Sequence, residues 1–327
     1  MMSRERQNER GAELVFGLPF LFGRSTGSSS HQKRGGSLIF KLILIAVVIS
    51  SALIPSSAQI ESGEPGRSTP TWLFPDGPLL PFLLAAPREP VTRAHLVHAD
   101  PNPTAYGPGP AGEVAVSVTA PVILLGGGDQ TAVVVGIEGA AFARFSFAVI
   151  TRELVNTDWI FAVPLVWRRG GDWLRLRYYH TSSHLGDEYQ GRFGPSSINY
   201  SRDGLELTAF ARPGIEGLRR WRLGLYAGGL WSVNSHPEGG SVWRARAGFE
   251  IDPSRGMLWQ PYGGLDAEFE EGSDHGVRIV TQIGIWLPPV QGRPLRLALE
   301  IIDGPWVMGQ FTRRATRRVA LGLLWNP

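Results

Sequence analysis

The sequence lacks cysteine altogether over its 327 residues. This absence excludes a disulfide-bonded scaffold, a zinc site with cysteine ligands and a thiol nucleophile. The chain also lacks a basic patch with interleaved aromatic residues after residue 41, although its formal net charge is +3. Much of the basic excess lies in the first 41 residues, so nucleic acid is not an expected partner.

Long hydrophobic runs are scarce, and the clearest one is the segment 42–54 (LILIAVVISSALI). It follows the basic residues Lys33, Arg34 and Lys41 and precedes small residues at 56–58. A run of about 13 apolar residues is shorter than the ~20 that a membrane-spanning helix needs. We therefore expect a cleaved secretory signal peptide here, with a transmembrane helix as the competing interpretation.

What the sequence does contain is alternation of apolar and polar residues with a period of two, which is typical of strands that separate two environments. In the segment 173–182, for example, the leucines fall on one face and the arginines on the other. Twelve strands are expected, at 93–99, 113–124, 131–139, 158–167, 173–182, 198–211, 222–231, 242–251, 260–270, 277–287, 295–301 and 318–325.

The connections between these strands alternate in length. Short turns, such as 168–172 and 288–294, alternate with longer polar loops, such as 184–197 and 303–317. An even number of strands, short turns at one end and long loops at the other are typical of bacterial outer-membrane barrels. We therefore predict an all-β fold, a transmembrane antiparallel up-and-down β-barrel of about 12 strands. A soluble β-sandwich is the rival, but it predicts a shared dry core instead of a charged face on every strand.

Charged residues on the predicted inner face could either pair with one another and fill the interior or line a channel. In a barrel of this size, mixed charges pair and fill the interior, leaving at most a narrow small-solute pore. The residues concerned are Arg175, Arg177, Arg244, Arg246, Arg278, Glu250, Glu268 and Glu300.

The segment before the barrel is rich in proline. Pro75, Pro78 and Pro81 interrupt an apolar stretch, which excludes a helix or a central strand there. We expect a periplasmic linker that plugs the barrel or packs on its mouth. The predicted organisation is residues 1–58 as N-terminal extension and signal peptide, 59–90 as the Pro-rich linker or plug, and 91–327 as the barrel.

Four stretches together resemble a bacterial family known as domain of unknown function 1207, whose members are thought to be outer-membrane barrels. The stretches are 83–90 (LLAAPREP), 156–170 (NTDWIFAVPLVWRRG), 178–188 (YYHTSSHLGDE) and 301–311 (IIDGPWVMGQF). The resemblance runs from about residue 75 to the C-terminus. It implies a location in the outer membrane and a barrel architecture, and it implies no activity. The expected partners are outer-membrane lipids and the barrel-assembly machinery.

One constellation points to chemistry. His180 and Ser182 continue the lipid-facing side of their strand near its outer end, where polar side chains are costly unless they are used. The His-x-Ser spacing resembles that of the outer-membrane phospholipase and the lipid A deacylase. The hypothesis is a lipid-ester hydrolase with His180 as base, Ser182 as nucleophile and Asn199 or Asp203 as the group that orients the imidazole.

Two further interpretations stand beside this hypothesis. The primary prediction is a barrel with a structural or binding role, in which His180 and Ser182 hydrogen-bond an ordered loop, and the lipid-ester hydrolase is the alternative to it. His184, Asp187 and Glu188 could bind a divalent ion such as calcium, because carboxylates on a glycine-containing loop suit a hard cation. Apart from calcium, no cofactor is expected.

Overall fold

The computed structural model describes residues 71–325 except 76, 129–130, 195, 219, 239, 254–259, 273–275 and 291–292. The predicted signal peptide and the first part of the linker lie outside the described residues. None of the helices in the described part is long and apolar enough to cross a membrane. The described helical elements are α2 (Asp187–Phe193), η1 (Glu216–Leu218) and η2 (Gly309–Phe311).

The strands follow one another along the chain as expected from the alternation. All twelve predicted strands are present, and most extend a few residues beyond their predicted ends. The bounds are β1 (Thr71–Leu73), β2 (Thr92–Asp100), β3 (Ala111–Gly128), β4 (Thr131–Ser146), β5 (Leu154–Arg169), β6 (Asp172–Leu185), β7 (Tyr200–Ala211), β8 (Trp221–His236), β9 (Trp243–Pro253), β10 (Gln260–Glu270), β11 (Val277–Val290), β12 (Arg293–Pro305) and β13 (Ala315–Trp325).

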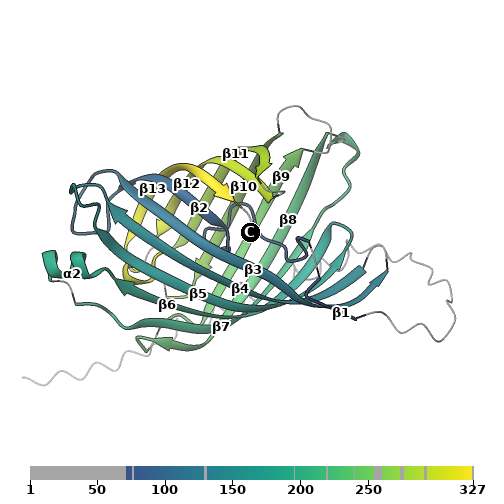
Figure 1. Cartoon of the computed structure of the whole chain (residues 1–327), viewed down its shortest axis with the longest axis horizontal. Helices are drawn as coiled ribbons and strands as arrows, with labels where there is room; N and C mark the ends of the chain where they lie inside the picture. The colour runs from purple at the N-terminus through teal and green to yellow at the C-terminus, as the bar shows by residue number, and fades with distance from the viewer. Residues whose placement is uncertain are drawn as a thin grey trace, which may run out of the picture.

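The sheet closes on itself because β13 pairs antiparallel with β2, and Trp325 lies opposite Thr92. Strands β2 to β13 therefore form a ring of antiparallel neighbours, which Figure 1 shows as one continuous tilted wall. The additional strand β1 pairs with β3 outside the ring, with Trp72 opposite Leu124. Closure leaves the ring without an exposed edge strand and confirms the predicted barrel.

The two ends of the barrel differ in the length of their connections. At one end, two-residue turns such as 170–171 join β5 to β6, whereas 14 residues, 186–199, join β6 to β7 at the other end. We call these the short-turn end and the long-loop end. The N-terminal end of β2 and the C-terminal end of β13 both lie at the short-turn end.

The outer surface of the wall is apolar. Leu96, Val116, Trp159, Ile283 and Leu321 are each more than half exposed, and residues of this kind recur on every second position of their strands. So large a continuous apolar surface is unfavourable in water and is typical of a face in contact with hydrocarbon.

The inner surface is charged, and its charges are paired. Arg318 is 2% exposed and contacts the carboxylates of Glu113 and Glu300. Arg177 contacts Glu206 at 2.8 Å and Glu138 at 3.2 Å. The sequence therefore assigned the arginines and glutamates to the correct face, and pairing satisfies the charges in the lumen.

Residues 78–90 lie inside the ring as a plug. Arg168 donates to the backbone oxygen of Leu79 at 2.9 Å, and Arg175 binds the carboxylate of Glu89 at 2.7 Å. Leu83 and Leu84, 1% and 6% exposed, pack against apolar and aromatic residues of the inner wall. Proline-rich extended chain suits this place because its backbone oxygens accept hydrogen bonds from inward arginines, and the prolines leave few unpaired N–H groups.

Arg318 and its sequence neighbour Arg317 allow a direct test of the difference between the two faces. Replacing Arg318 with leucine leaves two buried carboxylates without this partner, so we expect a loss of about 3–5 kcal/mol in the free energy of unfolding. Urea unfolding in detergent micelles, followed by the heat-dependent shift in gel mobility, measures this loss.

The matched control is Arg317→Leu. The Arg317 and Asp303 side chains form a pair on the outer rim, where they are 72% and 56% exposed, so its loss should change stability by less than about 1 kcal/mol. Equal effects of the two substitutions would contradict the assignment of the faces.

Candidate functional site

The outer wall becomes polar at the long-loop ends of β6 and β7. On β6, His180 and Ser182 alternate with Tyr179, Thr181 and Ser183, which are 6%, 7% and 1% exposed. Because successive side chains of a strand point to opposite faces, His180 and Ser182 point outward. The predicted parity of both residues therefore agrees with the structure.

His180 is held by a carboxylate on the neighbouring strand. The register of β6 and β7 places His180 directly opposite Asp203, and the distance from His180 Nδ1 to Asp203 Oδ1 is 2.8 Å. The two side chains are 44% and 25% exposed, so the contact lies on the outer surface. When Nδ1 carries the hydrogen, this contact orients the ring and leaves Nε2 with a free lone pair.

Asp203 is itself fixed by two other residues. The hydroxyl of Tyr178 donates to Asp203 Oδ1 at 3.0 Å, and the amide of Asn234 donates to Oδ2 at 3.3 Å. A register shift in the pairing of β7 with β8 leaves Val233 without an opposite residue and places Asn234 opposite Asp203. Such a bulge redirects a side chain to the other face, and it brings Asn234 to the outer surface. Sequence alternation alone places Asn234 inside, so its outward position has no signal in the sequence.

Ser182 lies one row nearer the long-loop end than His180. It is opposite Ser201 on β7 and opposite Trp159 on β5. Two positions along one face of a strand, the Cα atoms of Ser182 and His180 are about 6–7 Å apart. Within the described part of the chain, the Ser182 hydroxyl has no hydrogen bond to any partner, the His180 imidazole included, so the hydroxyl is uncommitted.

The structure distinguishes the two proposed orienting residues. Asn199 precedes β7 and is exposed, and no hydrogen bond joins it to His180 within the described residues. Asp203 makes that contact instead. In the sequence, Asn199 and Asp203 have the same parity as the lipid-facing residues. The pairing of β6 with β7 distinguishes them, because it places Asp203 opposite His180.

His184, Asp187 and Glu188 do not form a metal site in this structure. The described residues contain no group of three or more histidine and carboxylate side chains that could hold a metal ion. The physical reason is helix α2: Asp187 and Glu188 occupy its exposed first turn, while His184 lies on the outer face of β6, one residue before its end.

Helix α2 is anchored to the neighbouring loops. Tyr189 is buried, and its hydroxyl accepts the backbone N–H of Ala105 at 2.8 Å. Arg192 Nε donates to Glu153 Oε2 at 2.8 Å, and Tyr106 donates to the same carboxylate. The hydrogen bonds from Arg192 and Tyr106 hold the pKa of Glu153 at about 2. The loop above the site is therefore ordered by these contacts.

On the inner face of the wall, behind His180 and Ser182, which we call the dyad, Asp158 joins β6 to the plug. Asp158 is 1% exposed and accepts hydrogen bonds from Arg88 and from the backbone N–H of Gly309, both at 2.9 Å, and from Ser183. Gln310 adds a hydrogen bond to the backbone oxygen of Ser183 at 2.7 Å. The four sequence stretches that resemble the family meet at this carboxylate, and they fix the end of β6 that carries Ser182.

Aromatic side chains surround the dyad on the outer surface. Trp159 and Phe161, 54% and 51% exposed, lie on β5 opposite Ser182 and His180. On the other side, the rings of Trp231 and Trp243 stack with centroids 5.9 Å apart. Tryptophans are enriched where hydrocarbon meets water in membrane proteins.

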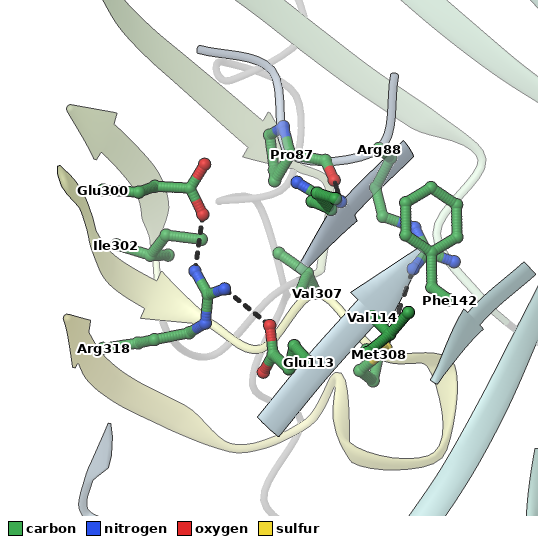
Figure 2. Close-up of a pocket in the computed structure, with 11 residues that line it drawn as sticks. Pro87, Arg88, Glu113, Val114, Phe142, Glu300, Ile302, Val307, Met308 and Arg318 are labelled. Atoms are coloured by element: carbon green, nitrogen blue, oxygen red, sulfur yellow. Dashed lines mark hydrogen bonds and ion pairs between the residues drawn. The ribbon is translucent and has the colours of Figure 1, made fainter. Parts of the chain in front are cut away.

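The lumen offers little space. Figure 2 shows a cavity between the plug and the wall, in which Arg318 reaches Glu113 and Glu300 while Arg88 points at Met308. Its volume is about 10 Å³, which is room for about one water molecule. The small size of this cavity agrees with the predicted packing of paired charges between the plug and the wall.

A second hollow lies on the outer rim of β2, β12 and β13, with a volume of about 530 Å³. His98, Asp100, Asp303 and Arg317 line it. Its hydroxyl residue, Thr316, is 3% exposed and donates to the backbone oxygen of Pro101 at 2.7 Å. The hydroxyl in this hollow is therefore engaged, in contrast to that of Ser182 on β6.

A family model described as "Protein of unknown function (DUF1207)" matches residues 52–326. No curated protein sequence matches the chain.

Solved structures of similar fold are bacterial outer-membrane proteins. The outer membrane phospholipase dimer with bound calcium from Salmonella typhi is 12% identical, with 72% of this chain and 90% of that chain covered and a TM-score of 0.49. The COG4313 outer membrane channel from Pseudomonas putida F1 is 10% identical, with 76% of this chain and 99% of that chain covered and a TM-score of 0.40. The transport unit of the autotransporter AIDA-I from Escherichia coli is 11% identical, with 86% of this chain and 96% of that chain covered and a TM-score of 0.38. These likenesses concern the kind of fold and carry nothing about activity.

The hydrogen bond between His180 and Asp203 predicts the tautomer of the imidazole. In the neutral ring of His180, the ¹⁵N chemical shifts in micelles should show the hydrogen on Nδ1. In Asp203→Ala the preference for Nδ1–H should disappear, whereas Asn199→Ala should leave it unchanged. A neutral ring with its hydrogen on Nε2 in the unsubstituted protein would contradict the geometry.

Proposed function

This chain belongs to the family described as Protein of unknown function (DUF1207), and from that premise we propose, on the geometry of its own side chains, that it hydrolyses ester bonds of membrane lipids. The single observation that carries the proposal is the 2.8 Å contact between His180 and Asp203 on the outer, lipid-facing wall. A serine hydroxyl without a hydrogen-bond partner in the described part of the chain lies two residues away on the same face.

The chemistry follows that of a serine hydrolase. Ser182 Oγ bonds to the ester carbonyl carbon while Nε2 of His180 accepts the hydroxyl proton. The bond from the carbonyl carbon to the alcohol oxygen then breaks, and the alcohol leaves with the proton held by His180. Water attacks the acyl group on Ser182 and gives a proton to the same Nε2, which releases a fatty acid and restores the serine hydroxyl. Asp203 stabilises the protonated imidazole in both steps.

The position of the dyad favours a lipid as substrate. Leu205 and Leu207 continue the face of Asp203 toward the short-turn end, so acyl chains have an apolar surface below the reacting atoms. The exposed aromatic residues support a position of those atoms at the interface, where the ester bonds of lipids lie. A lipid reaches the site laterally from the bilayer and does not enter the lumen.

The proposal includes a location and an orientation. Long loops face outward in bacterial outer-membrane barrels, which supports a position of the dyad in the outer leaflet. Export through the predicted cleaved signal peptide in residues 1–58 and insertion by the barrel-assembly machinery would bring the chain there. The lipid substrate is then a phospholipid or lipid A of that leaflet.

The test is lipid hydrolysis by the purified chain in mixed micelles. We expect release of fatty acid from a diacyl phospholipid or from lipid A, and Ser182→Ala should lower kcat by about 10⁴-fold or more because the nucleophile is lost. His180→Ala should have a similar effect. Asp203→Ala should lower kcat less, because the imidazole remains but is no longer oriented.

Two controls separate chemistry from folding. Ser197→Ala removes an exposed serine from the same loop and should retain full activity. Every variant must also keep the heat-dependent gel mobility of a folded barrel. Absence of hydrolysis by the folded wild-type protein on both lipid classes, or undiminished hydrolysis by Ser182→Ala, would refute the proposed function and leave the structural or binding role.

A further inference from the structure

A nucleophile on a strand of a closed barrel has few backbone hydrogen-bond donors near it, unlike a nucleophile on a loop. The negative charge that develops on the ester carbonyl oxygen needs hydrogen-bond donors. Ser182 has neighbours on both sides, Trp159 on β5 and Ser201 on β7. Backbone N–H groups of a strand paired on both sides are used in the sheet, so the donors must come from side chains on the outer face.

We propose that the hydroxyl of Ser201 is such a donor and stabilises the oxyanion formed when Ser182 attacks the ester, an inference that rests on the proposed function. Ser201 lies directly opposite Ser182. Cβ atoms of directly opposed residues are about 4.5–5.5 Å apart, which allows both hydroxyls to contact one carbonyl group, Ser182 at its carbon and Ser201 at its oxygen. Within the described part of the chain, the Ser201 hydroxyl has no hydrogen-bond partner.

The strand around Ser201 is held so that this hydroxyl stays outside. Its neighbours Tyr200 and Arg202 are 8% and 7% exposed and point inward. Arg202 binds Glu270 at 2.7 Å, and its guanidinium lies 5.4 Å from the centre of the Tyr200 ring. These contacts fix β7 at this position. A preorganised donor costs little reorganisation when the charge develops.

Other side chains near Ser182 fit this role less well. The hydroxyl of Ser183 is inside and donates to Asp158. His236 lies opposite Ser201 on β8, one strand further from the nucleophile. The indole of Trp159 borders Ser182 on the other side and is the strongest competitor, because its ring nitrogen is also a donor.

The experiment compares kcat and KM for phospholipid hydrolysis in Ser201→Ala, Ser201→Thr, Trp159→Phe and Ser197→Ala. Ser201→Ala should lower kcat by about a hundredfold with KM changed less than about threefold, because the lost hydrogen bond exists only in the transition state. Ser201→Thr keeps the hydroxyl and should restore kcat to within about tenfold of the wild type. Trp159→Phe removes the indole N–H and keeps an aromatic side chain, so it tests the competing donor and should lower kcat less than Ser201→Ala does. Ser197→Ala is the folding control and should retain kcat.

The outcomes separate this inference from the proposed function. If Ser182→Ala abolishes hydrolysis but Ser201→Ala retains full kcat, the role of Ser201 is refuted and the hydrolase stands. A large loss in Trp159→Phe without a loss in Ser201→Ala also refutes it and assigns the oxyanion to the indole. If Ser182→Ala remains fully active, both the function and the role of Ser201 are refuted.

Discussion

The pairing of buried charges inside the ring is the constraint on which the rest of the structure depends. Each strand must give one face to hydrocarbon and the other to a crowded lumen. Arginines of that lumen, such as Arg177 and Arg318, are stable there because each contacts at least two carboxylates. The plug adds to the same network through Glu89 and Arg88. With the interior filled in this way, the outer wall is the surface left for chemistry.

A strand of such a wall presents every second residue to the membrane, and that is how the candidate site is built. His180 and Ser182 share the outer face of β6, and the register brings Asp203 and Ser201 opposite them. The neighbouring residues Thr181 and Ser183 are buried and point inward, and Ser183 anchors the strand from the inside. The position of the outer residues thus depends on contacts in the lumen, including the hydrogen bond from Ser183 to Asp158.

Much of this architecture follows from the sequence, because a period of two is a local property. The alternation located twelve strands, and parity placed Arg175 inside and His180 outside. Register is not local, since it depends on loop length and on bulges. The sequence therefore left Asn199 and Asp203 as equal partners of His180. It also had no signal for Asn234, which reaches the outer face through the bulge at Val233. Nor did it indicate helix α2, which carries Asp187 and Glu188 and so sets them on a different element from His184.

The central claim is that the outer wall of this barrel carries an activated serine, and covalent labelling tests it most directly. A long-chain alkyl sulfonyl fluoride transfers its sulfonyl group to an activated serine hydroxyl and releases fluoride. Peptide mass spectrometry of the folded barrel after reaction should locate one adduct on Ser182, and the adduct should be missing in His180→Ala. An unlabelled Ser182 in the wild-type protein, or equal labelling in both proteins, would contradict the account.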